Sequence, residues 1–351
     1  MAKSKVLVVG TGGIGTMAAY ALEKGGQAEV TAVMRSNYSA AVKNGIDIDC
    51  VEYGQIRAWR PTAIVKSVVE ASIAPFDYIV VTTKNLPDIK PTVADIIAPA
   101  VTPGKTTIVL SQNGINIEKP LIERFPSNPL ISSVAYTGAA ETAHAKIYSA
   151  DADCQKIGPF VNPQVPAEVA EDAARRYVEI YNPSGSLDVV YEPNVAAVRW
   201  RKLAYNASFN PVASILGLDT PRMRMSRHVI EDLIVPIIHE ISAIAEASGV
   251  ILQKDLFESV LTQDHPDDPF KPSMCQDYEK GQLMEIENIV GEAVREGDKS
   301  GVSTPTLRVI YGIMKGLQFK VKEQKGLWEA SWGPDNPYLY GQKPKLNLQE
   351  R

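Results

Sequence analysis

Over the first half of the chain, short apolar runs rich in β-branched residues alternate with segments of helix-forming composition. Polar residues or glycines bound each run, which is typical of buried strands in a parallel sheet with crossover helices. The predicted strands are residues 5–9, 29–34, 76–83, 106–110 and 130–134. The signals over residues 46–56 are mixed and indicate short strands and turns.

The pattern changes near residue 194, where long helix-compatible stretches replace the strand signal. These stretches are residues 195–209, 227–247 and 281–296, and Gly, Pro and Ser concentrate at 182–186, just before the change. We therefore expect an α/β domain at 1–190 and an all-helical domain at 191–327. Residues 328–351 are rich in Pro, Gly, Asn and Lys, which predicts an extended C-terminal tail.

Composition narrows the class of ligand. The chain has 351 residues, of which 45% are hydrophobic and 22% charged, so it can bury a sizeable core. Its formal net charge of −5 argues against nucleic-acid binding, because such binding draws its affinity from clustered Lys and Arg. A small-molecule partner is the better expectation.

Cysteine and histidine positions argue against a metal site. Cys50, Cys154 and Cys275 are far apart, and the four histidines are scattered without metal-ligand spacing, so we expect reduced thiols and no metal. The N-terminus lacks a signal-like segment, and no apolar stretch approaches the ~18 residues of a membrane span. We expect a cytoplasmic protein that does not associate with membranes.

A glycine cluster follows the first predicted strand. Gly10, Gly12 and Gly15 form a G-x-G-x-x-G pattern at the mouth of a predicted helix, with Gly13 and Ile14 between them. In this pattern the first glycine permits a tight turn, the second admits a pyrophosphate, and the third lets helix and strand pack closely. The placement predicts a Rossmann-type dinucleotide-binding domain. A glycine-rich turn without a ligand is the alternative.

The end of the second predicted strand bears on the choice of dinucleotide. An acidic residue there would bind the ribose 2′-hydroxyl of NAD, but this chain has Arg35, whose guanidinium suits a 2′-phosphate. Ser36 and Asn37 would add neutral donors. NADP(H) is therefore the predicted cofactor. Alternatively, Arg35 is a solvated surface residue and another group decides.

Polar residues also follow two later strands. Lys84 and Asn113 stand at the carboxyl ends of the strands at 76–83 and 106–110, the edge where ligands of open α/β sheets collect. We expect both side chains to face the nicotinamide or the substrate.

In the second half, the segment WRKLAYNASFNP places three polar side chains at four-residue intervals: Lys202, Asn206 and Asn210. On a helix they share one face. Pro211 biases its predecessor away from helical geometry, so we expect the third member to lie at a helix end. The alternative is a solvated stripe beside Arg199 and Arg201.

Taken together, these motifs resemble those of the ketopantoate reductase (2-dehydropantoate 2-reductase) family. The resemblance rests on GTGGIG, TTK at Lys84, QNG at Asn113, WRKLAYNASFNP, and PSMCQDYEKGQLMEIENIVGEAV from Pro272. It runs through most of the chain. It implies a Rossmann domain, an all-helical C-terminal domain and an active site between them. Extra length around 149–191 and after residue 328 departs from compact family members.

The resemblance also implies roles for single residues. Lys202 would be the general acid, and Glu285 the acidic partner near the lysine and the substrate. The residues that would hold the substrate are Asn206, Asn210 and Ser273, the last at its carboxylate end. Lys84 and Asn113 would line the cofactor and substrate site.

The implied function is NADPH-dependent reduction of a 2-keto acid, most specifically 2-dehydropantoate to pantoate in pantothenate biosynthesis. Hydride delivery to a ketone builds negative charge on oxygen, which an ammonium group stabilises and protonates. One alternative is a related NADP(H)-dependent reductase or dehydrogenase of another keto or hydroxy acid. Another is a nonenzymatic NADP(H) sensor, against which the retained lysine argues. A homodimer through the helical domain is also an expectation.

Overall fold

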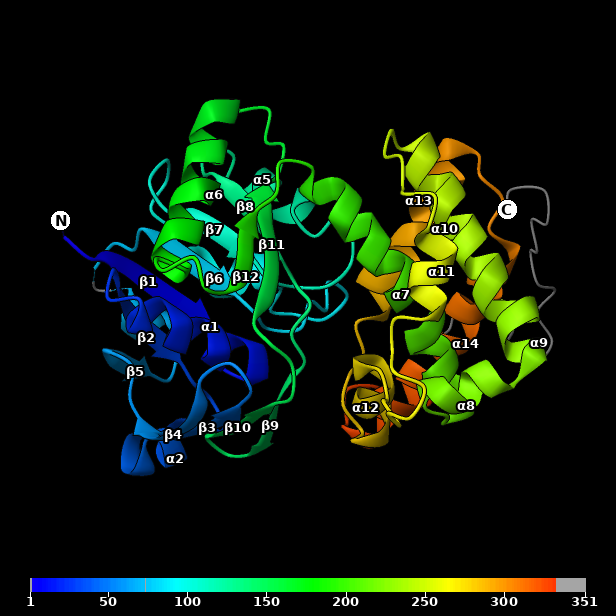
Figure 1. Ribbon diagram of the computed structural model, residues 1–351, viewed down its shortest axis with the longest axis horizontal. Helices are drawn as coiled ribbons and strands as arrows, with labels where there is room; N and C mark the ends of the chain where they lie inside the picture. Colours follow the sequence, from blue (N-terminus) through cyan, green and yellow to red (C-terminus); the bar gives the residue numbers. More distant parts are fainter. Residues whose placement is uncertain (1, 73, 333–351) are drawn as a thin grey trace.

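The computed structural model describes residues 2–72 and 74–332. The chain forms a sheet-containing N-terminal part and a helical C-terminal part that lie side by side (Figure 1). This arrangement confirms the predicted α/β domain followed by helices.

An eight-stranded sheet, in the order β12-β11-β8-β7-β6-β1-β2-β5, forms the centre of the N-terminal part. All neighbouring pairs are parallel except β8 and β11. The strands are β1 (Ser4–Val9), β2 (Ala28–Val33), β5 (Ala63–Val65), β6 (Tyr78–Val81), β7 (Thr107–Leu110), β8 (Leu130–Ala135), β11 (Cys154–Pro159) and β12 (Asp188–Tyr191). The five predicted strands are therefore confirmed, as β1, β2, β6, β7 and β8.

Both faces of this sheet are buried, which explains the continuous apolar runs. Val6 and Val8 of β1 face one layer, formed by α1 (Gly13–Lys24) and α6 (Ala167–Tyr181). Leu7 and Val9 face the opposite layer. That layer contains α3 (Val68–Ala71), α4 (Val93–Ile97), η1 (Ala98–Ala100) and α5 (Lys119–Arg124).

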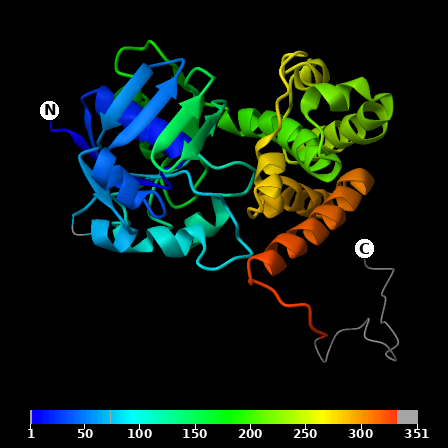
Figure 2. The same ribbon diagram turned by 90° about the horizontal axis from the view of Figure 1, so that it is seen from below.

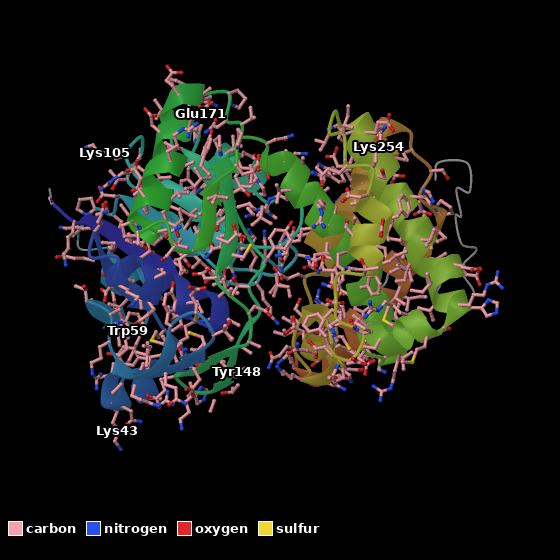
Figure 3. The ribbon with its side chains drawn as sticks, viewed as in Figure 1. Lys43, Trp59, Lys105, Tyr148, Glu171 and Lys254 are labelled. Carbon is pink, nitrogen blue, oxygen red and sulfur yellow. The ribbon has the colours of Figure 1, made fainter. Side chains whose placement is uncertain are left out.

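A second sheet of four strands lies at the lower end of the N-terminal part in Figure 1, near α2 (Tyr38–Asn44). Its order is β4 (Gly54–Trp59), β3 (Ile46–Cys50), β10 (Lys146–Ser149) and β9 (Ala139–Ala143). Lys43, Trp59 and Tyr148 mark this region in Figure 3. The predicted short strands within 46–56 are confirmed as β3 and β4. The sequence did not predict β9, whose AAETA segment is largely exposed and lacks an apolar run.

The C-terminal part is helical, as predicted, and its core gathers around α7 and α10. Its elements are α7 (Val195–Leu216), α8 (Thr220–Met225), α9 (Arg227–Val229), η2 (Ile230–Ile234), α10 (Val235–Ala247), α11 (Leu256–Leu261), α12 (Ser273–Glu279), η3 (Glu287–Gly291), α13 (Glu292–Ser300) and α14 (Pro305–Gln324). The helix predicted at 227–247 is confirmed as α9, η2 and α10. Figure 2 shows α7 leaving the sheet and running into the helical part.

Two expectations about helix ends are wrong. α7 continues through Pro211 to Leu216, so Asn210 lies inside the helix. The missing N–H of the proline costs one helical hydrogen bond, but α7 is buried on most sides from Leu203 to Ser214, and this packing outweighs the local preference. The helix predicted at 281–296 begins only at residue 286, because Gly281, at φ 61°, ends the turn after α12 and residues 282–285 form neither helix nor strand.

The predicted domain limits stay predictions. The limit at residue 190 falls inside β12, and α7 begins at Val195. Of the predicted tail, residues 333–351 lie outside the described residues, and 328–332 contain neither helix nor strand. Within the described ranges no helix is long and apolar enough to cross a bilayer. The same ranges hold no cluster of three His, Cys, Asp or Glu side chains suited to a metal ion.

Candidate active site

The glycine loop joins β1 to α1 with the geometry that the fingerprint predicts. Gly10 has φ 101° and packs against Thr83, so a side chain at Gly10 would be strained and would also collide. A Cβ at Gly15 would lie 2.3 Å from the carbonyl oxygen of Gly10. These two glycines therefore fix the turn and the close packing of helix and strand.

Gly12 and Gly13 differ in their surroundings. A Cβ on Gly12 would meet no atom within 4 Å, whereas one on Gly13 would lie 2.0 Å from the carbonyl oxygen of Ala139 in β9. The small sheet thus packs against the start of α1, where Ile14 is partly exposed. The open side at Gly12, next to the N–H groups that begin α1, leaves room for a phosphate group.

Arg35 follows β2, and its side chain is exposed. Nearby, Asn37 is buried and donates to the carbonyl oxygen of Thr11 at 2.8 Å and to Glu141 at 2.9 Å. Asn37 therefore ties the loop after β2 to the glycine loop and to β9. Lys66, which follows the neighbouring strand β5, is a second exposed cation at this edge.

The ends of β6 and β7 meet the helical part directly. Lys84 forms an ion pair with Asp277 of α12, with 2.5 Å between Nζ and Oδ1. The Asn85 N–H and the Asn113 side-chain amide donate to the two oxygens of Glu285, at 2.9 and 3.4 Å. The structure therefore brings Lys84 and Asn113 close to two carboxylates of the helical part, Asp277 and Glu285.

Burial raises the pKa of Glu285 above its ordinary value, although the hydrogen bonds from Asn85 and Asn113 and the charge of Lys84 oppose the rise. Glu285 lies just before the helix that starts at residue 286 and not within it, which corrects the expectation of a helical position. In this place its side chain is free to point at the strand ends.

Lys202 lies in the first half of α7, where the helix passes the end of β8. Its Nζ donates to the carbonyl oxygen of Ala135 and lies 5.7 Å from the centre of the Tyr136 ring. No hydrogen bond joins Lys202 to Glu285 among the described residues; the two interact through their charges.

The electrostatic setting of Lys202 favours loss of its proton. Burial is the largest influence and the charge of Arg199 adds to it, and together they lower the pKa of Lys202 to about 8, against the opposing effect of Glu285. A lysine with this pKa is mostly protonated at neutral pH yet releases a proton far more readily than a free lysine.

Asn206 and Asn210 follow Lys202 along α7, and their side chains are 7% and 2% exposed. The Oδ1 atom of Asn210 is buried without a hydrogen-bond partner among the described residues, a costly state that a bound polar molecule would relieve. The solvated-stripe alternative is wrong for these residues. Ser273 is exposed at the start of α12, four residues before Asp277 on the same helix.

Sequence reasoning missed two residues near the strand ends. Asn288 donates to the carbonyl oxygen of Asn85 at 2.9 Å, and Arg199 donates to the carbonyl oxygens of Gln112 and Gly114 at 2.8 Å each. Arg199 is buried, so the alternative of a solvated stripe is wrong for this residue as well. Its position three residues before Lys202 places it on the same helix face and was the available signal.

Comparison with known proteins identifies the family. A family model described as ketopantoate reductase PanE/ApbA matches residues 6–162, and the model of the C-terminal part of this reductase matches residues 194–318. The chain belongs to the ketopantoate reductase family. The resemblance drawn from the motifs is thus confirmed, and it places the chain among oxidoreductases.

Members of the ketopantoate reductase family and proteins of the same fold match nearly the whole chain. An uncharacterized protein of Saccharomyces cerevisiae is 36% identical over 348 residues, covering 92% of this chain and 96% of that protein. The crystal structure of 2-dehydropantoate 2-reductase from Methylococcus capsulatus has a TM-score of 0.77 at 31% identity, covering 90% of this chain and 97% of the other. D-mandelate dehydrogenase, solved with NADH and anilino(oxo)acetate, shares the fold with a TM-score of 0.76 at 19% identity, covering 91% and 99%.

Proposed function

We propose that the protein is an NADPH-dependent reductase of a 2-keto acid, and that 2-dehydropantoate is its substrate. The observation that carries this proposal is Lys202, a partly buried lysine whose pKa is lowered to about 8 where α7 meets the carboxyl edge of the sheet. A lysine in such a setting suits proton transfer. Kinship with a 2-dehydropantoate 2-reductase at 31% identity supports the choice of substrate.

The residues of the N-terminal part fit a dinucleotide. The open side of Gly12 and the N-terminal N–H groups of α1 would hold the pyrophosphate. Arg35, exposed after β2, would bind the 2′-phosphate, and this residue is our reason for preferring NADP(H) to NAD. When bound, the nicotinamide supplies the hydride. Lys84 and Asn113 stand at the strand ends that would flank it.

The residues of the helical part would act on the substrate. Asn210, with its unpartnered Oδ1, and Asn206 would hold the substrate hydroxyl and carbonyl groups. Ser273, exposed at the start of α12, would bind the carboxylate end. Lys202 would donate its Nζ proton to the carbonyl oxygen as negative charge develops there. Glu285 would keep Lys202 protonated at neutral pH, because its charge opposes the fall in the pKa of the lysine.

The first experiment mixes purified protein with NADPH and 2-dehydropantoate and follows the absorbance of the reduced nicotinamide. Parallel reactions replace NADPH with NADH and replace the substrate with 2-oxoisovalerate or benzoylformate. We expect turnover that requires 2-dehydropantoate and prefers NADPH. Turnover only with another 2-keto acid would contradict the substrate, and binding of NADPH without turnover of any keto acid would favour a sensor.

Homodimerisation through the helical part stays a prediction. Light scattering coupled to size-exclusion chromatography measures the mass directly, and a mass near the 38.2 kDa of one chain would contradict the dimer.

A further inference from the structure

Arg199 is a buried cation held by neutral groups. Its side chain is 6% exposed, and its guanidinium lies 5.2 Å from the centre of the Phe160 ring. Nη1 donates to the carbonyl oxygens of Gln112 and Gly114, while Nη2 and Nε donate to Ser132 Oγ at 2.7 and 3.2 Å. Within the described ranges, no carboxylate oxygen lies within the 4.0 Å of an ion pair.

Burying a guanidinium without a paired carboxylate carries a large desolvation cost. This cost lowers the pKa of Arg199 to about 10. The negative charge of Glu118, which forms no ion pair with Arg199, offsets part of this cost. Neutral donors could satisfy the same two carbonyl groups and hydroxyl, so the positive charge calls for a further explanation. The neighbours of Arg199 supply one.

The two carbonyl groups that bind Arg199 belong to the residues on either side of Asn113, and Asn113 in turn donates to Glu285. On the helix, Arg199 precedes Lys202 by three residues, so the two cations share one face of α7. Arg199 therefore contacts the loop of one predicted site residue and acts through charge on another.

We propose that Arg199 is a positioning residue for the reaction, which holds the Asn113 loop against Glu285 and places a positive charge one helical turn before Lys202. The proposal rests on the proposed function, since Asn113 and Lys202 receive their roles there. It assigns Arg199 no contact with substrate or cofactor.

Several charged and titratable groups surround Lys202 and Arg199, and each can influence the pKa of Lys202 or Arg199. The groups that face Lys202 are Arg199 on its own helix, Glu285 before η3, Cys154 of β11 and the Tyr136 ring after β8. Arg199 lowers the pKa of Lys202, whereas Glu285 and Cys154 raise it. The groups that face Arg199 are Glu118 and Tyr136. Removal of Arg199 thus leaves the influences that raise the pKa of Lys202 in place.

Two variants of the full chain separate the two effects. Arg199→Met removes the charge and all four hydrogen bonds. Arg199→Lys keeps the charge, but a single ammonium nitrogen cannot reach Gln112, Gly114 and Ser132 together as the planar guanidinium does. Arg227→Met is the matched control, because Arg227 is exposed in α9 and pairs only at the surface with Glu231.

Two measurements serve as readouts. The rate of Lys202 acetylation by acetic anhydride, followed by mass spectrometry across pH, reports the pKa of the lysine without any turnover. Fluorescence titration with NADPH reports the state of the Asn113 loop. Thermal unfolding confirms that each variant is folded at the temperature used.

We expect Arg199→Met to move the acetylation midpoint up by about one pH unit, as for two cations near each other in a partly buried setting. We expect Arg199→Lys to keep the midpoint but to raise the Kd for NADPH about tenfold, the loss that follows removal of about 1.4 kcal/mol. Arg227→Met should change neither.

An unchanged midpoint in folded Arg199→Met, together with an unchanged Kd in Arg199→Lys, would overturn the proposal and leave Arg199 as a structural residue. If Arg199→Met does not fold, the Arg199→Lys variant decides the positioning role alone, through its Kd. Failure of the proposed function gives a different result: no keto acid would be reduced by the unaltered protein, while its acetylation midpoint would still respond to Arg199→Met.

Discussion

Replacing Lys202 by methionine should remove activity and stabilise the fold at neutral pH. The pKa of Lys202 falls from 10.5 in the unfolded chain to about 8 in the folded protein, mainly because of burial. This difference corresponds to about 3 kcal/mol of destabilisation by the charged form. Methionine has a similar length without the charge, but it gives up the hydrogen bond to Ala135, worth about 1 kcal/mol. The expected net gain is about 2 kcal/mol.

The gain in stability that Lys202→Met brings should decrease as the pH rises above about 8. Below pH 8 both folded and unfolded states carry the charged lysine, so the unaltered protein bears the full cost of burial. Between about 8 and 10.5 the folded state has lost the proton and the unfolded state has not, so the stability of the unaltered protein rises with pH. The burial cost that Lys202→Met removes should therefore shrink to about 1 kcal/mol near pH 9.5. This is about the contribution of the hydrogen bond that the variant loses. Near pH 9.5 the variant and the unaltered protein should therefore have nearly the same free energy of unfolding.

Urea unfolding at pH 7 and near pH 9.5, followed by tryptophan fluorescence, measures both quantities. Turnover of 2-dehydropantoate by the same samples should fall at least about 100-fold, the usual loss when a general acid is removed. A variant that is less stable than the unaltered protein at pH 7, with a difference that pH does not change, would refute the reasoning. Lys254→Met, in a loop of the helical part and exposed, controls for loss of a lysine charge.

Three further predictions concern the cofactor loop and the acidic partner. Gly12→Ala should leave the melting temperature nearly unchanged and weaken NADPH binding at least tenfold. Gly13→Ala should unfold at a lower temperature, because its Cβ would meet a backbone carbonyl group of β9. Equal melting temperatures of the two variants would contradict this contrast. Arg35→Asp should lower kcat/KM with NADPH about tenfold or more and favour NADH, and an unchanged ratio would show that another group selects the cofactor. In the unaltered protein, turnover should fall as the pH rises through about 8, the pKa of Lys202. In Glu285→Gln this fall should occur at a lower pH, because the charge that raises the pKa of Lys202 is lost; a fall at a higher pH would refute the assignment.

Local patterns predicted those parts of the fold that depend on near neighbours. The strands β1, β2, β6, β7 and β8 pack on both faces of the sheet, so most of their residues are buried and apolar. The glycine loop is likewise local, because φ at Gly10 and the contact of Gly15 with Gly10 involve residues close in sequence. By contrast, β9 is largely exposed and pairs with β10 across a short turn, so its sequence has little to distinguish it from a loop.

Local patterns failed where tertiary packing overrules a local preference. Pro211 predicted a helix end, but its surroundings on α7 are fully buried, and the burial stabilises the helix beyond the single hydrogen bond that proline removes. Arg199 stands among charged residues, and the sequence left open whether they form a solvated stripe. Helical spacing could indicate that Arg199 lies on the same face as Lys202, but its burial depends on carbonyl groups 85 and 87 positions away in the chain.

The site itself is a product of contacts between distant segments. Glu285 accepts hydrogen bonds from Asn85 and Asn113, which lie 200 and 172 positions before it, and Asn288 binds Asn85 over 203 positions. Motif order could indicate that these residues belong to one site, but only the fold shows that the carboxylate lies at the strand ends and not beside Lys202. Because of this placement, separate groups raise and lower the pKa of Lys202. The lysine receives burial from α7, a positive neighbour from its own helix and a negative charge held at a distance by the sheet, and their balance keeps the pKa near 8, between a lysine that never releases its proton and one that never holds it.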